Sequence, residues 1–409
     1  MAPRIAVQAT DRFERKREAI LDAATDILNA CGVKGLTLAV TAAAVGLSTT
    51  SVTYYFRRKD DLAAACMLRG IEDLVLIVTS ALSEPTPQAA LNTLLRLYLD
   101  RVRRTALGEA PPLPVLADIR ALNMPRRGEV SDAYMKLFRR LRTLFETPEL
   151  AWLSRGRRTA RTQMLFEQLF WASAWLPRYD PEDYGRVHAR MYDILASGLA
   201  APGAIWSPLA IPLGRLATRN GPDLGRETFL LAATRLINAR GYRGASVDKI
   251  SAALNVTKGS FYHHNQAKDD LVVACFDRTF EVMTQVQRLA MDLPGDQWTR
   301  LSSAAAALAE YQLCEHGPLL RTSALAALPE PIRREMVRQS DRVSDRFASM
   351  ISDGIAEGSL RAVDASIAAQ MLNATLNAGA ELGVWVPGVS QKAAPAVFAR
   401  PLLMGVFAR

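Results

Sequence analysis

Residues 20–69 and 229–278 carry one pattern twice: they read ILDAATDILNACGVKGLTLAVTAAAVGLSTTSVTYYFRRKDDLAAACMLR and FLLAATRLINARGYRGASVDKISAALNVTKGSFYHHNQAKDDLVVACFDR. The two stretches align without a gap, with 18 identities in 50 positions and a constant offset of 209 residues. Self-similarity at a fixed spacing is the signature of an internal repeat. The sequence therefore predicts the same local fold in both halves of the chain.

Each copy begins with a segment typical of an amphipathic helix. In the first copy Ile20, Ala24 and Leu28 recur at helical spacing and would face one side. Gly32 and Gly241 occupy equivalent positions after these segments. We expect them to end the helix, because glycine adopts a left-handed conformation without a steric penalty.

Two further short helices are predicted in each copy. A hydroxyl stands at each expected N-cap: Thr37 and Ser48 in the first copy, Ser246 and Thr257 in the second. In the first copy the second helix should cover residues 38–44, and a tight turn should lead to a third helix after Ser48. Two short helices joined by such a turn form a helix-turn-helix.

The third helix of a helix-turn-helix enters the major groove of DNA, so its first turn supplies the candidate contacts. Lys258 and His263 could read guanine, whereas the first copy offers hydroxyls and a tyrosine without charge. Lys59 and Lys268 precede Asp-Asp-Leu and are expected to hold a phosphate. The competing interpretation, ordinary solvated helix residues, is less favoured because of the repeat and its caps. The candidate DNA-binding residues are Thr37, Ser48, Thr49, Thr50, Ser51, Thr53, Tyr54 and Lys59 in the first copy, and Ser246, Thr257, Lys258, Gly259, Ser260, Tyr262, His263 and Lys268 in the second.

Both copies resemble the DNA-binding domain of TetR (tetracycline-repressor) family transcription regulators. That family's pattern runs approximately T-V-x-x-I-A-x-x-A-G-V-S-K-G-T-L-Y-x-Y-F-x-x-K-x-x-L. The second copy follows it through Lys258, Gly259 and Tyr262, but has His264 and Asn265 where the family usually has an aromatic pair.

The first copy departs from the family pattern elsewhere. It keeps Tyr55 and Phe56, but has Thr41, Thr50 and Thr53 at the positions of the isoleucine, the glycine and the first tyrosine. The resemblance therefore implies two DNA-reading heads that are not identical.

The duplication extends beyond the heads. Gln163-Met164-Leu165 recurs as Gln370-Met371-Leu372, at an offset of 207. In the family, the second domain is a helical bundle whose last two long helices usually form the dimer interface. The resemblance thus implies an all-α chain of two TetR-like halves packed as an intramolecular pseudo-dimer, and it leaves room for further self-association. The expected divisions are a first helix-turn-helix domain (12–70), a first C-terminal helical ligand-binding and dimerisation domain (71–200), a linker rich in proline and glycine (201–222), a second helix-turn-helix domain (223–279) and a second C-terminal helical domain (280–409).

The resemblance also implies a small-molecule effector that enters a bundle and releases DNA. The candidate pocket residues are Phe166, Phe170, Trp171 and Trp175. An aromatic stripe at helical spacing is more often core or interface, so that alternative stays open. An apolar effector is preferred.

The amino-acid composition bears on the partners, the metal binding and the location of the protein. The formal charge of +9, from 50 basic and 41 acidic residues, fits a phosphate-bearing partner or a mere solubility bias equally well. The four cysteines are far apart and are expected to be reduced and buried, and Cys314-Glu315-His316 lacks a further metal ligand. No targeting segment or membrane-length apolar run is visible, so we expect a cytoplasmic protein.

No enzyme motif is found, and no cofactor is expected. The favoured function is a DNA-binding transcriptional regulator, a repressor released by a small effector, that binds a pseudo-palindromic double-stranded operator with two non-identical heads. The alternative is a helical ligand-binding or scaffolding protein in which one or both heads have degenerated.

Overall fold

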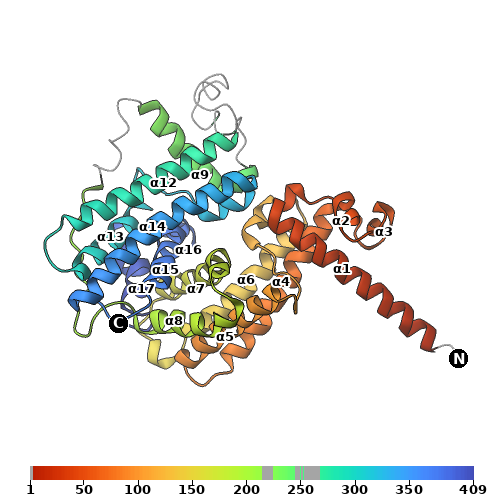
Figure 1. The fold of residues 1–409 in the computed structure, drawn as a ribbon, viewed down its shortest axis with the longest axis horizontal. Helices are drawn as coiled ribbons and strands as arrows, with labels where there is room; N and C mark the ends of the chain where they lie inside the picture. Colours follow the sequence, from red (N-terminus) through yellow and green to blue (C-terminus); the bar gives the residue numbers. More distant parts are fainter. Residues whose placement is uncertain (1–2, 214–223, 245–248, 250–251, 253–267) are drawn as a thin grey trace.

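The structure is a computed structural model that describes residues 3–213, 224–244, 249, 252 and 268–409 (Figure 1). Within these residues the chain is helical and forms no strand, as the sequence predicted. Among the same residues, none of the helices combines the length and the apolar character needed to cross a membrane.

The described part of the first half contains eight α-helices. A short 3₁₀ helix, η1 (Leu116–Ala121), lies in the loop between α5 and α6. The α-helices are α1 (Pro3–Gly35), α2 (Leu38–Ala44), α3 (Thr49–Tyr55), α4 (Lys59–Leu82), α5 (Pro87–Ala106), α6 (Arg126–Arg142), α7 (Arg155–Trp175) and α8 (Tyr184–Ser197).

The described part of the second half repeats this order. The short helix η7 (Thr322–Ala327) takes the place of η1. The other elements are α9 (Leu224–Gly244), α12 (Lys268–Met291), α13 (Gln297–Tyr311), α14 (Glu330–Glu357), α15 (Ala365–Ala378), η8 (Gly379–Glu381), α16 (Leu382–Trp385), η9 (Gln391–Ala393), η10 (Pro395–Ala399) and α17 (Arg400–Met404).

The first helix of each head ends as the sequence predicted. Gly32 has φ 62° and Gly241 has φ 71°, so the chain turns out of the helix at equivalent positions of α1 and α9. Only glycine adopts such a conformation at little cost. In Figure 1 the amino-terminal turns of α1 project away from the rest of the molecule.

The two halves meet where α7 packs against α15. Gln168 Nε2 donates to Thr375 Oγ1 at 2.8 Å and to the Met371 carbonyl oxygen at 2.9 Å. These bonds are buried, and they satisfy an amide that would otherwise cost free energy in the core. The interface is therefore held by specific polar contacts as well as by apolar packing.

A buried arginine adds to the same interface. Arg161 on α7 donates from Nε to the carbonyl oxygen of Val406 at 2.8 Å, and its guanidinium lies 5.5 Å from the centre of the Trp152 ring. Burial, with Arg157 and Arg400 nearby, lowers the pKa of Arg161 to about 9. The side chain therefore remains a cation at neutral pH, stabilised by a carbonyl and an aromatic face.

The chain that follows α8 packs along α13. Trp298 Nε1 donates to the Ile205 carbonyl oxygen at 2.9 Å, and the Trp206 and Trp298 rings meet edge to face. Leu209 N donates to Ser303 Oγ at 2.8 Å. The described part of the linker, 201–213, is thus attached to the surface of the second bundle.

The cysteines follow the expectation only in part. All four are free thiols, and Cys66 and Cys275 are buried. Cys31, however, is exposed and Cys314 is half-buried, because neither lies on the inward face of its segment.

Candidate DNA-reading heads and the cavity between the halves

The helix-turn-helix of the first head forms as predicted from its caps. Thr37 Oγ1 accepts from Val40 N at 3.1 Å, and Ser48 Oγ accepts from Ser51 N at 3.1 Å. Gly46 lies between the helices with φ 65°. The hydroxyls of Thr37 and Ser48 are therefore occupied by helix capping.

The helix α3 has one buried and one exposed face. Val52 is fully buried and anchors the helix, whereas Thr49, Thr50 and Thr53 are exposed and Tyr54 is 76% exposed. Exposed small hydroxyls allow the helix axis to approach a groove closely. The candidate residues on α3 thus share a surface that a duplex could reach.

An aromatic cluster beside α3 was not predicted from the sequence. The ring of Phe13, on α1, lies 4.6 Å from that of Tyr55 and 6.0 Å from that of Tyr54. Arg17 lies over the Phe56 ring at 5.8 Å, and α1 also exposes Lys16. The first head therefore has positive charge beside α3, although α3 itself has none.

Lys59 is the first residue of α4 and is exposed, as are Arg57 and Arg58 before it. Asp61 Oδ2 accepts from Arg58 N at 3.1 Å and so caps the same helix end. Three exposed cations at this end make a suitable contact for a phosphate backbone.

The candidate residues of the second head are mostly outside the described part of the chain. Lys268 begins α12, at the position that Lys59 has on α4. The others, Ser246, Thr257, Lys258, Gly259, Ser260, Tyr262 and His263, lie outside the described residues.

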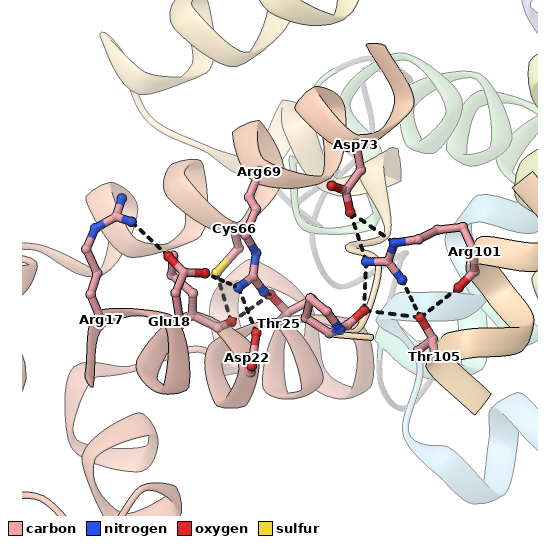
Figure 2. A network of polar contacts seen from close by, with 11 residues as sticks. Arg17, Glu18, Asp22, Thr25, Cys66, Arg69, Asp73, Arg101 and Thr105 are labelled. Carbon is pink, nitrogen blue, oxygen red and sulfur yellow. Dashed lines mark hydrogen bonds and ion pairs between the residues drawn. The ribbon is translucent and has the colours of Figure 1, made fainter. Parts of the chain in front are cut away.

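In each head the same pair of side chains joins the first helix to the long helix that leads into the bundle. In Figure 2, Arg69 on α4 donates to Glu18 at 2.9 Å and to Asp22 at 2.7 Å, both on α1. Its equivalent, Arg278, binds Glu227 of α9 at 2.6 Å. The arginine and its glutamate partner are the same in both halves, and they hold the first helix of each head against the long helix that follows it.

The buried thiols have the same role. Cys66 Sγ donates to the Leu21 carbonyl oxygen, and Cys275 Sγ donates to the Leu230 carbonyl oxygen, each at 3.6 Å. Burial raises the pKa of Cys66 to about 11 and that of Cys275 to about 12, so both thiols stay protonated and able to donate.

An asparagine connects each head to a loop of its bundle. Asn29 bonds through both side-chain atoms to the backbone of residues 113–115, at 2.8 Å each. Asn238 does the same to residues 319–321, at 2.8 and 3.0 Å. These loops run into η1 and η7. A shift of either loop would therefore be transmitted to the first helix of a head.

We expect Asn29→Ala to weaken this connection. The partly buried Leu113 carbonyl oxygen and the exposed Val115 N–H would lose their partners, at a cost of about 1–3 kcal/mol. Urea unfolding measures the loss, and amide hydrogen exchange should rise at residues 113–115. Asn92→Ala is the control, because the Asn92 side chain makes no hydrogen bond within the described structure. Equal effects of the two substitutions would contradict the connection.

A large cavity lies between the two halves. Its volume is about 1670 Å³, and residues of both halves line it. Ligand pockets usually measure about 300–1,000 Å³, so there is room for a sizeable molecule. The walls come from α5, α6, α7 and the loop 112–120 on one side, and from η7, α14, α15 and residues 384–387 on the other.

One wall of the cavity is aromatic. The rings of Phe138 and Trp385 stack at 4.3 Å across the two halves, and Phe138 stacks on Phe166 at 5.8 Å. Three of the four candidate pocket residues, Phe166, Phe170 and Trp171, line the cavity. Trp175 is buried against Tyr179 and is not among the lining residues.

A cluster of ion pairs crosses the cavity between the halves. Arg321 binds Glu167 at 3.0 Å and Glu381 at 2.6 Å, and Arg120 binds Glu381 at 2.5 Å. Burial raises the pKa of Glu167. Burial also acts to raise the pKa of Glu381, but Arg321 and Arg120 together hold it below its ordinary value. This cluster was not predicted from the sequence, because its members are far apart in the chain.

The first half of the chain carries a helix-turn-helix docked on a helical bundle, and α9 and α12 of the second half repeat α1 and α4. This arrangement is typical of regulators that bind DNA. The family model described as "Bacterial regulatory proteins, tetR family" matches residues 20–66 and 229–275, and "Tetracyclin repressor-like, C-terminal domain" matches residues 294–381. The chain belongs to the TetR family of transcriptional regulators and carries its DNA-binding module twice.

Individual relatives match parts of the chain. The Transposon Tn10 TetC protein of Escherichia coli is 32% identical over 77 residues, which are 19% of this chain and 39% of that protein. The chain therefore spans only about two fifths of that relative. The structure of the TetR-family regulator PfmR from Thermus thermophilus is similar with a TM-score of 0.38 and 20% identity, over 44% of this chain and 99% of the other. The structure of AibR with isovaleryl coenzyme A and operator DNA is similar with a TM-score of 0.36 and 21% identity, over 44% of this chain and 98% of the other.

Proposed function

We propose that this protein is a transcriptional repressor that binds a pseudo-palindromic operator as a single chain, with two non-identical heads, and is released by a small molecule in the cavity between its halves. The observation that carries the proposal is the way in which the two bundles contact each other. In this contact, the two halves of one chain take the places of the two subunits of a dimer.

The contacts at the interface are reciprocal. At the offset of 207 residues, Gln163 corresponds to Gln370 and Trp171 to Ala378. Gln163 Nε2 donates to the Ala378 carbonyl oxygen at 3.1 Å, and Trp171 Nε1 donates to Gln370 Oε1 at 3.3 Å. The same two positions thus meet in both directions, which is the rule for an interface with two-fold symmetry.

Equivalent residues also meet each other. Gln168 corresponds to Thr375, and the two are hydrogen-bonded. Gly198 corresponds to Gly405, and their backbones touch at the ends of α8 and α17. Self-contact of equivalent positions is expected only along a two-fold axis. These contacts support an intramolecular pseudo-dimer.

The difference between the heads supports an asymmetric operator. The exposed face of α3 carries hydroxyls and Tyr54, whereas the corresponding segment of the second head carries Lys258 and His263. Lysine can hold guanine acceptors, which uncharged threonines do less well. One half-site should therefore be specified more strictly than the other.

Stoichiometry tests the proposal. DNA fragments selected by the purified protein from genomic DNA should share two unequal half-sites, and light scattering should give one chain per operator. A complex that needs two chains would rule out the pseudo-dimer.

Substitutions in the heads test their roles separately. Thr50→Ala and Lys258→Ala should each weaken operator binding, by about 1–3 kcal/mol for a lost base contact, and each should relax a different half-site. Arg186→Ala, an exposed position on α8, is the control. If neither head variant changed binding, the alternative of a ligand-binding or scaffolding protein would be favoured.

A further inference from the structure

The cavity between the halves is strongly cationic. Among the described residues that line it, eight are arginines, whereas only Asp26, Glu167 and Glu381 are acidic. Six arginines lie outside the central ion-pair cluster: Arg139, Arg142, Arg155, Arg333, Arg334 and Arg338. An excess of one charge in a concave site attracts ligands of the opposite charge.

Arg142, Arg334 and Arg338 pair with glutamates on or beside their own helices, but two of the six arginines are available to a ligand. Arg139 and Arg155 are exposed and make no ion pair within the described structure. Guanidinium groups bind carboxylates, sulfonates and phosphates with paired hydrogen bonds. With the aromatic wall beside them, they suit a molecule that has both an apolar body and an anionic group.

Two arginines of the cavity also hold the heads, and each holds the head of the opposite half. Arg120, from the first half, donates to the Asn238 carbonyl oxygen on α9 at 2.5 Å. Arg333, from the second half, donates to the Ala30 carbonyl oxygen on α1 at 3.3 Å. An anion that turns either guanidinium toward the cavity would break these contacts, because the donors would then point at the anion.

We propose that the cavity binds an organic anion with an apolar body, and that the anion draws Arg120 and Arg333 away from the heads, so that each half controls the head of the other. This regulation rests on the proposed function as a DNA-binding regulator. It adds an anionic group to the apolar effector expected from the sequence, and it makes both heads respond to one site.

Calorimetry with three probes of equal chain length tests the ligand class. Decanoate and decyl phosphate should bind at least about tenfold more tightly than decanol, because only the anions can accept charge-assisted hydrogen bonds from the arginines. The tighter of the two anions identifies a carboxylate or a phosphate as the preferred group. Decanol binding as tightly as both anions, or no binding of either anion, would overturn the proposal.

Amide hydrogen exchange tests whether each half controls the head of the other. The measurement needs no DNA, so failure of this regulation can be distinguished from a failure to bind an operator. Decanoate, or decyl phosphate if that binds more tightly, should raise exchange at the carboxyl ends of both α1 and α9. With Arg120→Gln the response at α9 should disappear while that at α1 stays. With Arg333→Gln the pattern should reverse.

The control is Arg346→Gln, which removes an exposed arginine from the same helix as Arg333 but outside the cavity. It should keep both responses and the affinity of the unaltered protein. The proposal that each half controls the head of the other is wrong if each substitution abolishes the response in the head of its own half, or if Arg346→Gln acts as Arg333→Gln does.

Discussion

Replacement of Gly198 by alanine should destabilise the protein strongly. Gly198 has φ 72°, and a Cβ there would lie 2.5 Å from the Leu403 carbonyl oxygen and 2.6 Å from the Gly405 nitrogen. These are backbone atoms of the other half, and they are held by the bond from Leu199 N to the Leu403 carbonyl oxygen at 2.8 Å. The backbone therefore has little freedom to move aside.

The expected loss has two parts. A non-glycine residue at positive φ costs about 1–2 kcal/mol. Overpacking against a fixed backbone adds about 1–3 kcal/mol. The free energy of unfolding, measured with urea, should fall by the sum of both.

Gly203→Ala separates the two effects. Gly203 also has a positive φ, of 85°, but a Cβ there would meet nothing within 4 Å. It should show only the conformational cost. If Gly198→Ala were no worse than Gly203→Ala, the two halves would not be tightly packed at this point, and the pseudo-dimer would lose one of its supports.

The local structure of the first head could be predicted from the sequence because local interactions determine it. The cap hydroxyls of Thr37 and Ser48 and the turn at Gly46 act within a few residues of their own positions. The helix α2 accordingly begins and ends where the sequence indicated, at Leu38 and Ala44.

The role of several repeated residues could not be read from their repetition. Cys66 and Arg69 recur as Cys275 and Arg278, and repetition alone does not separate DNA contact from structure. The structure shows that both pairs join the first helix of a head to the long helix that follows it. Position on the buried side of a helix, and not identity, indicates this role.

The cavity was only partly predictable. Phe166, Phe170 and Trp171 stood out as aromatic residues at helical spacing, but nothing in the sequence places Trp385 or Arg321 beside them. These residues come from the other half, more than one hundred residues away. A site formed between the halves depends on how they dock, which local sequence patterns do not specify.

Arg321→Met should destabilise the protein, and the loss should depend on pH. Arg321 is the partner of both Glu167 and Glu381, and methionine keeps the apolar stem without the charge. Breaking a buried ion pair by removing one partner costs about 3–5 kcal/mol, because a desolvated charge remains. Urea unfolding at about pH 8 should show this loss.

At about pH 5 the loss should be smaller. Burial already raises the pKa of Glu167, and removal of Arg321 raises it further. A carboxyl group whose pKa is higher in the folded than in the unfolded protein binds more protons when folded, so stability rises as the pH falls toward the unfolded pKa. Adding Glu167→Gln to Arg321→Met should recover part of the loss at pH 8, since Glu381 keeps Arg120 as its partner. A loss that is equal at both pH values, or a double variant no more stable than the single one, would mean that Arg321 acts by packing and not as the charge that joins the two halves.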